Sequence, residues 1–164
     1  MHCAAPRLTE TYAAGPQVVG RARATLADFA LAAGATAVQA DAVRLAVSEA
    51  MTNAVVHAYR GGPGSIQVTA AAVAGELWIL IADDGGGLQP QADRPGLGLG
   101  LGLISQVSDD LAIVSRTGGG TEVRMRFTLQ AGGADAAEPA PPRRSGRVPG
   151  RGFRPSASSI SVLR

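Results

Sequence analysis

The segment from Ala46 to His57 constrains the fold more than any other, because it sets polar side chains inside an apolar stretch. Glu49, Asn53 and His57 follow one another at intervals of four residues. In an α-helix this spacing places all three on one side. A buried carboxylate or carboxamide is costly unless it is paired or coordinated. The stripe therefore either holds a ligand or faces solvent on the outer side of an amphipathic helix.

The chemistry of this stripe suits a nucleotide and its metal ion. The carbonyl oxygen of an Asn is a hard ligand of the kind that Mg²⁺ prefers, and a nearby Glu can orient a metal-bound water or accept a proton. Asn53 and Glu49 together therefore match a site for phosphates and metal. For His57 the simpler interpretation is a residue that caps or packs at the end of the helix.

The remaining patterns predict an α+β fold. The expected elements are a strand or arm within 1–15, helices 17–33 and 36–59, strands 66–73 and 77–82, a Gly- and Pro-rich loop 84–98, a helix 100–108, and strands 111–116 and 122–129. The strands 66–73 and 77–82 form a hairpin around Ala74-Gly75, and the last two strands form another around the glycines 118–120. This order predicts a two-layer α/β sandwich, with a mixed sheet covered on one face by helices.

Two glycine-rich segments follow the first hairpin. The apolar strand 77–82 leads into Asp83, Gly85 and Gly87, where a carboxylate can accept a hydrogen bond from a ligand amino group and glycines allow close approach of the backbone. Gly98 and Gly100 lie in a Gly-Leu repeat that opens a helix, which suits phosphate. An ordinary turn and a low-complexity loop are the alternatives. Gly-Lys-Ser/Thr is absent, so this is not a Walker A loop, and a Rossmann site is not expected because no strand abuts the repeat.

Composition separates a domain from a tail. Residues 1–130 hold nine Arg and eleven acidic residues, whereas residues 131–164 hold six Arg and two acidic residues among Ala, Gly, Pro and Ser. We expect a folded domain in 1–130 and a disordered Pro/Gly/Arg-rich tail in 131–164. The mild charge of the domain gives no support for nucleic-acid binding.

The same composition bears on location. No apolar run is long enough to cross a membrane, and the N-terminus lacks the pattern of a signal peptide. The single cysteine, Cys3, cannot form an internal disulfide. We therefore expect a cytoplasmic protein.

Four motifs, taken in order, resemble the N, G1, G2 and G3 boxes of the GHKL ATPase superfamily, which includes gyrase, histidine kinases and bacterial anti-sigma-factor serine kinases. The motifs are Glu49-x-x-x-Asn53, Asp83-x-Gly85-x-Gly87, Gly98-x-Gly100 and Gly120-Thr121. The stretches 46–59 and 98–110 look like the RsbW/SpoIIAB type of anti-sigma-factor kinase. The similarity extends over roughly residues 5–130.

The resemblance implies a Bergerat-type ATP-binding fold and a role for each motif. The implied site has Asn53 as the Mg²⁺ ligand, Glu49 as general base, Asp83 at the adenine amino group, Gly85, Gly87, Gly98 and Gly100 shaping the pocket, and Thr121 lining it. The implied reaction transfers the γ-phosphoryl group of ATP to a serine or threonine of an anti-sigma-factor antagonist of the STAS type. Members of this group also bind a sigma factor, usually as homodimers.

The chain departs from the family pattern in three places. The segment between Gly87 and Gly98 is short, and Arg94 is displaced from the position at which some relatives carry an Arg that serves the phosphates or the partner. The Arg-rich tail has no counterpart in the pattern.

Other functions remain as alternatives. They are a regulatory ATP-binding module outside sigma-factor control, the catalytic domain of a histidine kinase, and a sequestering protein that uses ATP only structurally. The histidine-kinase alternative is weak, because too few residues precede the first helix to form a phosphoacceptor domain.

Overall fold

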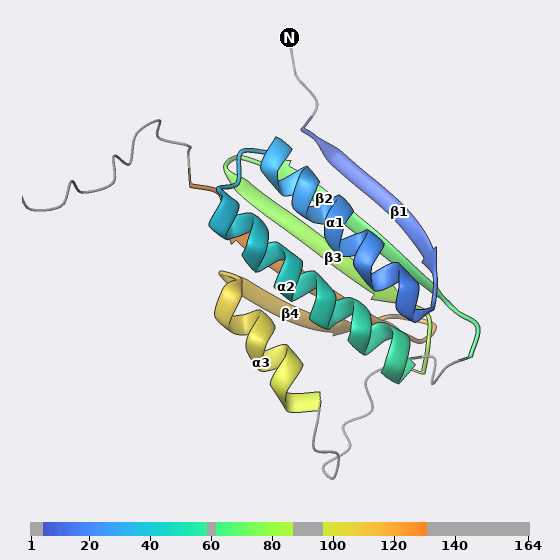
Figure 1. Cartoon of the computed structure of the whole chain (residues 1–164). Helices are drawn as coiled ribbons and strands as arrows, with labels where there is room; N and C mark the ends of the chain where they lie inside the picture. The colour runs from blue at the N-terminus through green and yellow to red at the C-terminus, as the bar shows by residue number, and fades with distance from the viewer. Residues whose placement is uncertain (1–4, 59–61, 87–96, 131–164) are drawn as a thin grey trace, which may run out of the picture. The chain divides into compact units, whose positions relative to one another are not determined.

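In a computed structural model, residues 5–58, 62–86 and 97–130 are described, without the side chains of residues 57–58 and 97–99. Figure 1 shows the elements in chain order. They are β1 (Arg7–Ala13), α1 (Pro16–Ala32), α2 (Ala37–Asn53), a π-helix (Ala54–Ala58), β2 (Ser65–Val73), β3 (Glu76–Asp83), α3 (Leu97–Val107), β4 (Asp110–Ser115) and β5 (Thr121–Thr128). The predicted domain boundary near residue 130 and the tail 131–164 border on or lie outside the described residues and stay a prediction.

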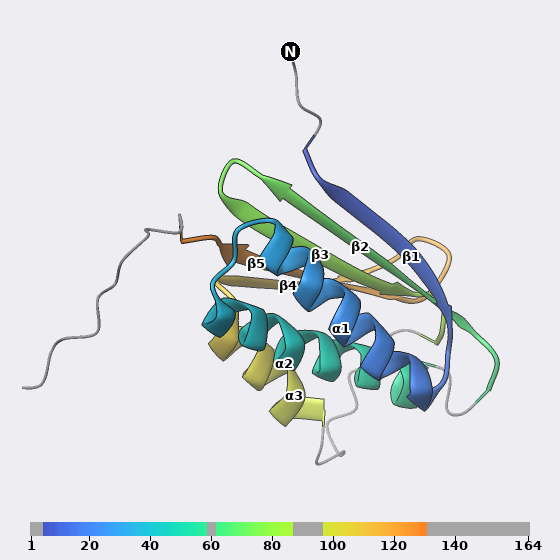
Figure 2. The same ribbon diagram turned by 45° about the horizontal axis from the view of Figure 1, so that its top comes forward.

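The described strands form a five-stranded sheet in the order β1-β2-β3-β5-β4. The helices α1, α2 and α3 all cover one face of it (Figures 1 and 2). This confirms the predicted two-layer α+β sandwich.

The prediction of a mixed sheet is wrong, because every pair of neighbouring strands is antiparallel. Two helices, α1 and α2, lie between β1 and β2 in the chain. Because the chain reverses direction from each element to the next, β2 runs antiparallel to β1. A single helix, α3, joins β3 to β4, which makes these two strands parallel. However, β5 lies between them and pairs antiparallel with both.

Alternate residues of the central strands build the core. On β3 the fully buried side chains are Leu77, Ile79 and Ile81, and β5 contributes Val123, Met125 and Phe127. The helices cover these side chains with small and aliphatic residues, among them Leu26, Val43, Val47, Ala50 and Met51. A period of two in the strands and a buried face on each helix explain why the elements could be located from sequence.

The helix α2 is anchored at its N-terminal end. Thr36 and Gln39 form a capping box, in which the Thr36 hydroxyl accepts from the Gln39 amide at 3.2 Å. The side chain of Gln39 also donates to the carbonyl oxygen of Thr128 at 2.7 Å, which ties the start of α2 to the end of β5. Thr36 is therefore the N-cap of α2.

The far end of α2 differs from the prediction of one helix to residue 59. The α-helix ends at Asn53 and continues as the π-helix Ala54–Ala58. A π-helix closes i to i+5 bonds, so the interval of four residues no longer aligns His57 with Glu49 and Asn53. Such turns occur frequently at functional sites.

Both hairpins are confirmed. Ala74 and Gly75 have positive φ values of 52° and 79°, as a tight turn between β2 and β3 requires. The helix α3 begins at Leu97, about three residues earlier than predicted. Among the described residues, no helix is long and apolar enough to span a membrane.

The capping box yields a stability prediction. Thr36→Ala should lower the free energy of unfolding by about 1 kcal/mol, because it leaves a helix amide without its acceptor. Thr52→Ala is the matched control, since Thr52 is exposed within the same helix and Ala favours helix there. Urea unfolding of both variants measures the difference, and equal midpoints would count against a stabilising cap.

Candidate functional site

Asp83 is a buried carboxylate at the end of a core strand. It is the last residue of β3, on the helix-covered face, with 7% of its surface exposed. Its Oδ1 accepts from the amide of Gly85 at 3.0 Å and from the amide of Thr121 at 3.3 Å. These two bonds hold the carboxylate in one orientation, and the second bond joins the end of β3 to the start of β5.

The surroundings of Asp83 disfavour its charge. Burial raises the pKa of Asp83 above the usual range, and the neighbouring charge of Asp84 adds to this rise. The amides of Gly85 and Thr121, and the guanidinium of Arg116, act in the opposite direction without reversing it. A buried acid with a raised pKa is typical of functional sites.

The turn between β4 and β5 packs directly against this strand end. Gly118, Gly119 and Gly120 all have positive φ values, of 98°, 104° and 92°. A Cβ added to Gly120 would lie 2.0 Å from the carbonyl oxygen of Asp83. Only glycine fits at position 120, because its positive φ is unfavourable for other residues and a Cβ would collide with Asp83.

A polar pair of α2 faces the start of α3. Glu49 and Asn53 are half-buried, and a Cβ on Gly100 would lie 2.8 Å from Glu49 Oε2 and 3.5 Å from Asn53 Nδ2. Gly98 and Gly100 both lie in the first turn of α3, where backbone amides lack partners within the helix. Glu49 and Asn53 therefore face a neighbouring helix. The expectation that these glycines open a helix is confirmed.

The two groups of residues lie at the same end of the domain. The end of α2, the end of β3 and the turn between β4 and β5 meet there in both views (Figures 1 and 2). Gly87 and Arg94 lie outside the described residues, and of His57 only the backbone is described. Within the described ranges, no cluster of three His, Cys, Asp or Glu side chains could hold a metal by itself.

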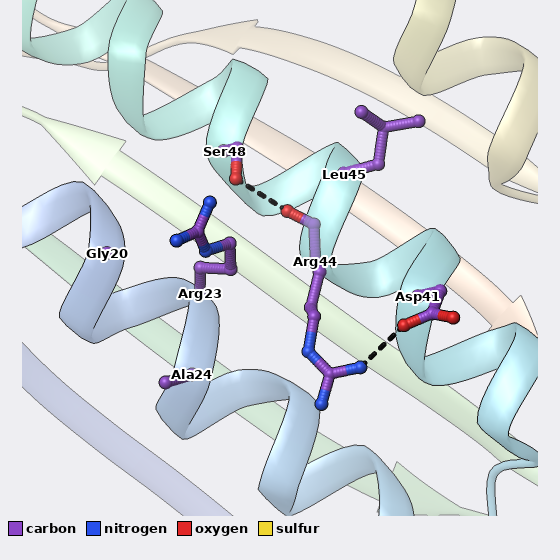
Figure 3. Close-up of a pocket in the computed structure, with 7 residues that line it drawn as sticks. All are labelled: Gly20, Arg23, Ala24, Asp41, Arg44, Leu45 and Ser48. Atoms are coloured by element: carbon purple, nitrogen blue, oxygen red, sulfur yellow. Dashed lines mark hydrogen bonds and ion pairs between the residues drawn. The ribbon is translucent and has the colours of Figure 1, made fainter.

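A groove between α1 and α2 is a separate surface. Figure 3 shows Arg23 and Arg44 extending between the two helices, with Gly20 and Ser48 beside them. Arg44 forms an exposed ion pair with Asp41 at 2.6 Å, and the Ser48 hydroxyl donates to the carbonyl oxygen of Arg44 at 2.7 Å. Ser48 thus lines this groove, whereas Glu49 and Asn53 face α3.

Arg116 contacts the candidate site, and sequence reasoning missed it. Its Nη1 donates to the carbonyl oxygen of Asp83 at 2.9 Å. A single Arg before a glycine-rich turn is not part of a recognisable sequence motif, so this contact becomes visible only in the folded structure.

Comparison with known proteins places the chain in a family. Residues 12–127 match the Histidine kinase-like ATPase domain. The chain belongs to this family. An anti-sigma F factor from Clostridium acetobutylicum is 33% identical over 116 residues, which cover 64% of this chain and 81% of that protein. A serine-protein kinase RsbW from Bacillus pumilus is 31% identical over 123 residues, which cover 64% of this chain and 76% of that protein.

Among solved structures, the histidine kinase domain of the E. coli osmosensor EnvZ overlaps with 60% of this chain and 71% of that chain, at a TM-score of 0.42 and 23% identity. The relatives named anti-sigma F factor and RsbW confirm the resemblance to the anti-sigma-factor branch, and the domain family implies ATP binding.

The tight contact at Gly120 yields a prediction with a matched control. Gly118→Ala should cost about 1–3 kcal/mol, because Gly118 has a positive φ but open space around it. Gly120→Ala adds a clash with the backbone of β3 to the same strain, so it should cost clearly more. Urea unfolding of the two variants gives both values, and equal losses would argue against the contact.

Proposed function

We propose that this protein is a serine/threonine protein kinase that uses Mg-ATP to phosphorylate an anti-sigma-factor antagonist of the STAS type, and that it also binds a sigma factor. The observation that carries the proposal is the half-buried pair of Glu49 and Asn53 against the first turn of α3. The names of the related proteins supply the class of partner. A homodimer in the cytoplasm is part of the same proposal.

The adenine end of the nucleotide is assigned to Asp83. Its Oδ1 is held by two backbone amides, which leaves Oδ2 as the acceptor that we assign to the adenine amino group. Thr121 begins β5 beside it, on the same buried face. We assign Gly85 and Gly87 to the wall of the pocket, where the absence of side chains lets the backbone approach the base.

The phosphate end is assigned to α2 and α3. Gly98 and Gly100 would present backbone amides to phosphate oxygens, as helix N-termini do. The carbonyl oxygen of Asn53 would hold Mg²⁺, which commonly takes one or two protein ligands and completes its shell with phosphate and water. The ion supplies charge neutralisation at the phosphates. This donor set fits without a cluster of protein carboxylates.

We assign the role of general base to Glu49, which lies with Asn53 against Gly100. The oxygen of the substrate serine or threonine would form a bond to the γ-phosphorus, the bond to the β-phosphate oxygen would break, and ADP would leave. Glu49 would take the hydroxyl proton. Most of the catalysis would come from positioning and charge neutralisation.

Phosphotransfer separates this proposal from a protein that sequesters a partner and uses ATP only structurally. The purified full chain would be incubated with Mg-ATP and a STAS-domain protein encoded in the same genome, and phosphate on serine or threonine detected by mass spectrometry. Tight ATP binding without phosphate on any STAS-domain protein of that genome would refute the kinase and favour the sequestering protein.

Asn53→Ala should remove phosphotransfer, by about a hundredfold or more, because charge neutralisation at the phosphates depends on the bound metal. Thr52→Ala, one residue away on the exposed side of α2, should keep its activity. Initial rates at saturating Mg-ATP measure both. An active Asn53→Ala variant would remove Asn53 from the site.

Asp83→Asn should separate binding from stability. The variant keeps an Oδ1 acceptor but loses the charge, so its Kd for ATP should rise about tenfold or more. Since the pKa of Asp83 is raised in the folded state, stability falls as pH rises through that pKa, and the variant should melt at the same or a higher temperature at neutral pH.

The control for this variant is Asp84→Asn, which alters the exposed neighbour. In the wild type, ATP binding should weaken as pH falls through the raised pKa of Asp83, and Asp83→Asn should lose that dependence. Calorimetric titration across pH measures this. Wild-type affinity in Asp83→Asn would contradict the adenine assignment.

A further inference from the structure

The last residue of β3 extends beyond the pairing of this strand with β5. The register of β3 with β5 ends at Ala82 opposite Glu122, whereas its register with β2 continues to Asp83 opposite Ile66. The carbonyl oxygen of Asp83 accepts from Nη1 of Arg116 at 2.9 Å. The side chain that completes the strand end thus comes from the turn after β4.

Arg116 is also bonded within its own turn. Its amide donates to the carbonyl oxygen of Gly120 at 3.1 Å, and its carbonyl oxygen accepts from the amide of Gly119 at 3.1 Å. One residue therefore links both sides of the glycine turn to Asp83. Glycine turns lose more backbone entropy on ordering than other turns, so this turn depends on such links for a fixed position.

We propose that Arg116 is a positioning residue for nucleotide recognition, which acts by holding the glycine turn and the end of β3 together so that Asp83 presents its free oxygen to the base. The proposal rests on the proposed function of Asp83. The position of Asp83 depends on the Thr121 amide at Oδ1 and on the contact of Gly120 with its carbonyl oxygen, and Arg116 fixes both partners.

The geometry separates the two ends of the nucleotide. Arg116 reaches the strand end that binds the base, whereas Glu49 and Asn53 lie against Gly100 at the phosphate end. Loss of Arg116 should therefore weaken ATP binding without slowing the transfer step. A general loss of folding would instead lower both binding and the transfer rate.

The test uses the full chain with Arg116→Ala, Arg116→Lys and, as control, Arg124→Ala. Arg124 is an exposed arginine of β5 that pairs with Glu122 at 2.5 Å, so its removal costs the same charge away from Asp83. Calorimetric titration with Mg-ATP gives Kd, and phosphotransfer to the STAS-domain protein gives KM and kcat. Thermal melting reports folding.

Arg116→Ala should raise Kd and KM for ATP about tenfold and leave kcat within about twofold, since a charge-assisted hydrogen bond is lost. Arg116→Lys restores one donor and should recover most of the affinity, and Arg124→Ala should match the wild type. An unchanged Kd for ATP in Arg116→Ala would overturn the inference. A loss of ATP affinity that accompanies a lower melting temperature and that Arg116→Lys does not restore would also overturn it. A wild-type protein that binds no ATP would refute the proposed function instead.

Discussion

The close approach of the β4–β5 turn to the end of β3 is the constraint on which the candidate site depends. No side chain fits between Gly120 and the carbonyl oxygen of Asp83, and this contact brings the Thr121 amide to the Asp83 carboxylate. The amide offsets part of the cost of burying the charge, as bonds to buried polar groups do. Without the glycine turn, Asp83 would keep its burial and lose this donor.

The second constraint is the crossing of α2 and α3. Gly100 allows the first turn of α3 to approach Glu49 and Asn53, so the polar pair meets backbone instead of an apolar side chain. The aliphatic core beneath α2 and the capping box at Thr36 fix that helix independently of the pair. The site is thus assembled from two glycine contacts on a scaffold that is stable for other reasons.

Sequence reasoning located most of the scaffold, whereas the roles of the site residues stay predictions. The strands and the helices follow from local periodicity and turn chemistry, which the chain displays residue by residue. The antiparallel sheet was missed because it depends on how often the chain passes between strands. The π-helix after Asn53 was missed because no residue there signals it. Arg116 was missed because its partner lies 33 residues away.

Asp83 carries a charge that its surroundings disfavour. Burial makes its ionised form unfavourable, and the donors around it reduce that cost without removing it. A neutral side chain of similar shape would satisfy the same two amides at less cost to stability. The apolar core of that strand is formed by Leu77, Ile79 and Ile81. Our proposal that the Asp83 carboxylate accepts a hydrogen bond from the adenine amino group would account for this charge.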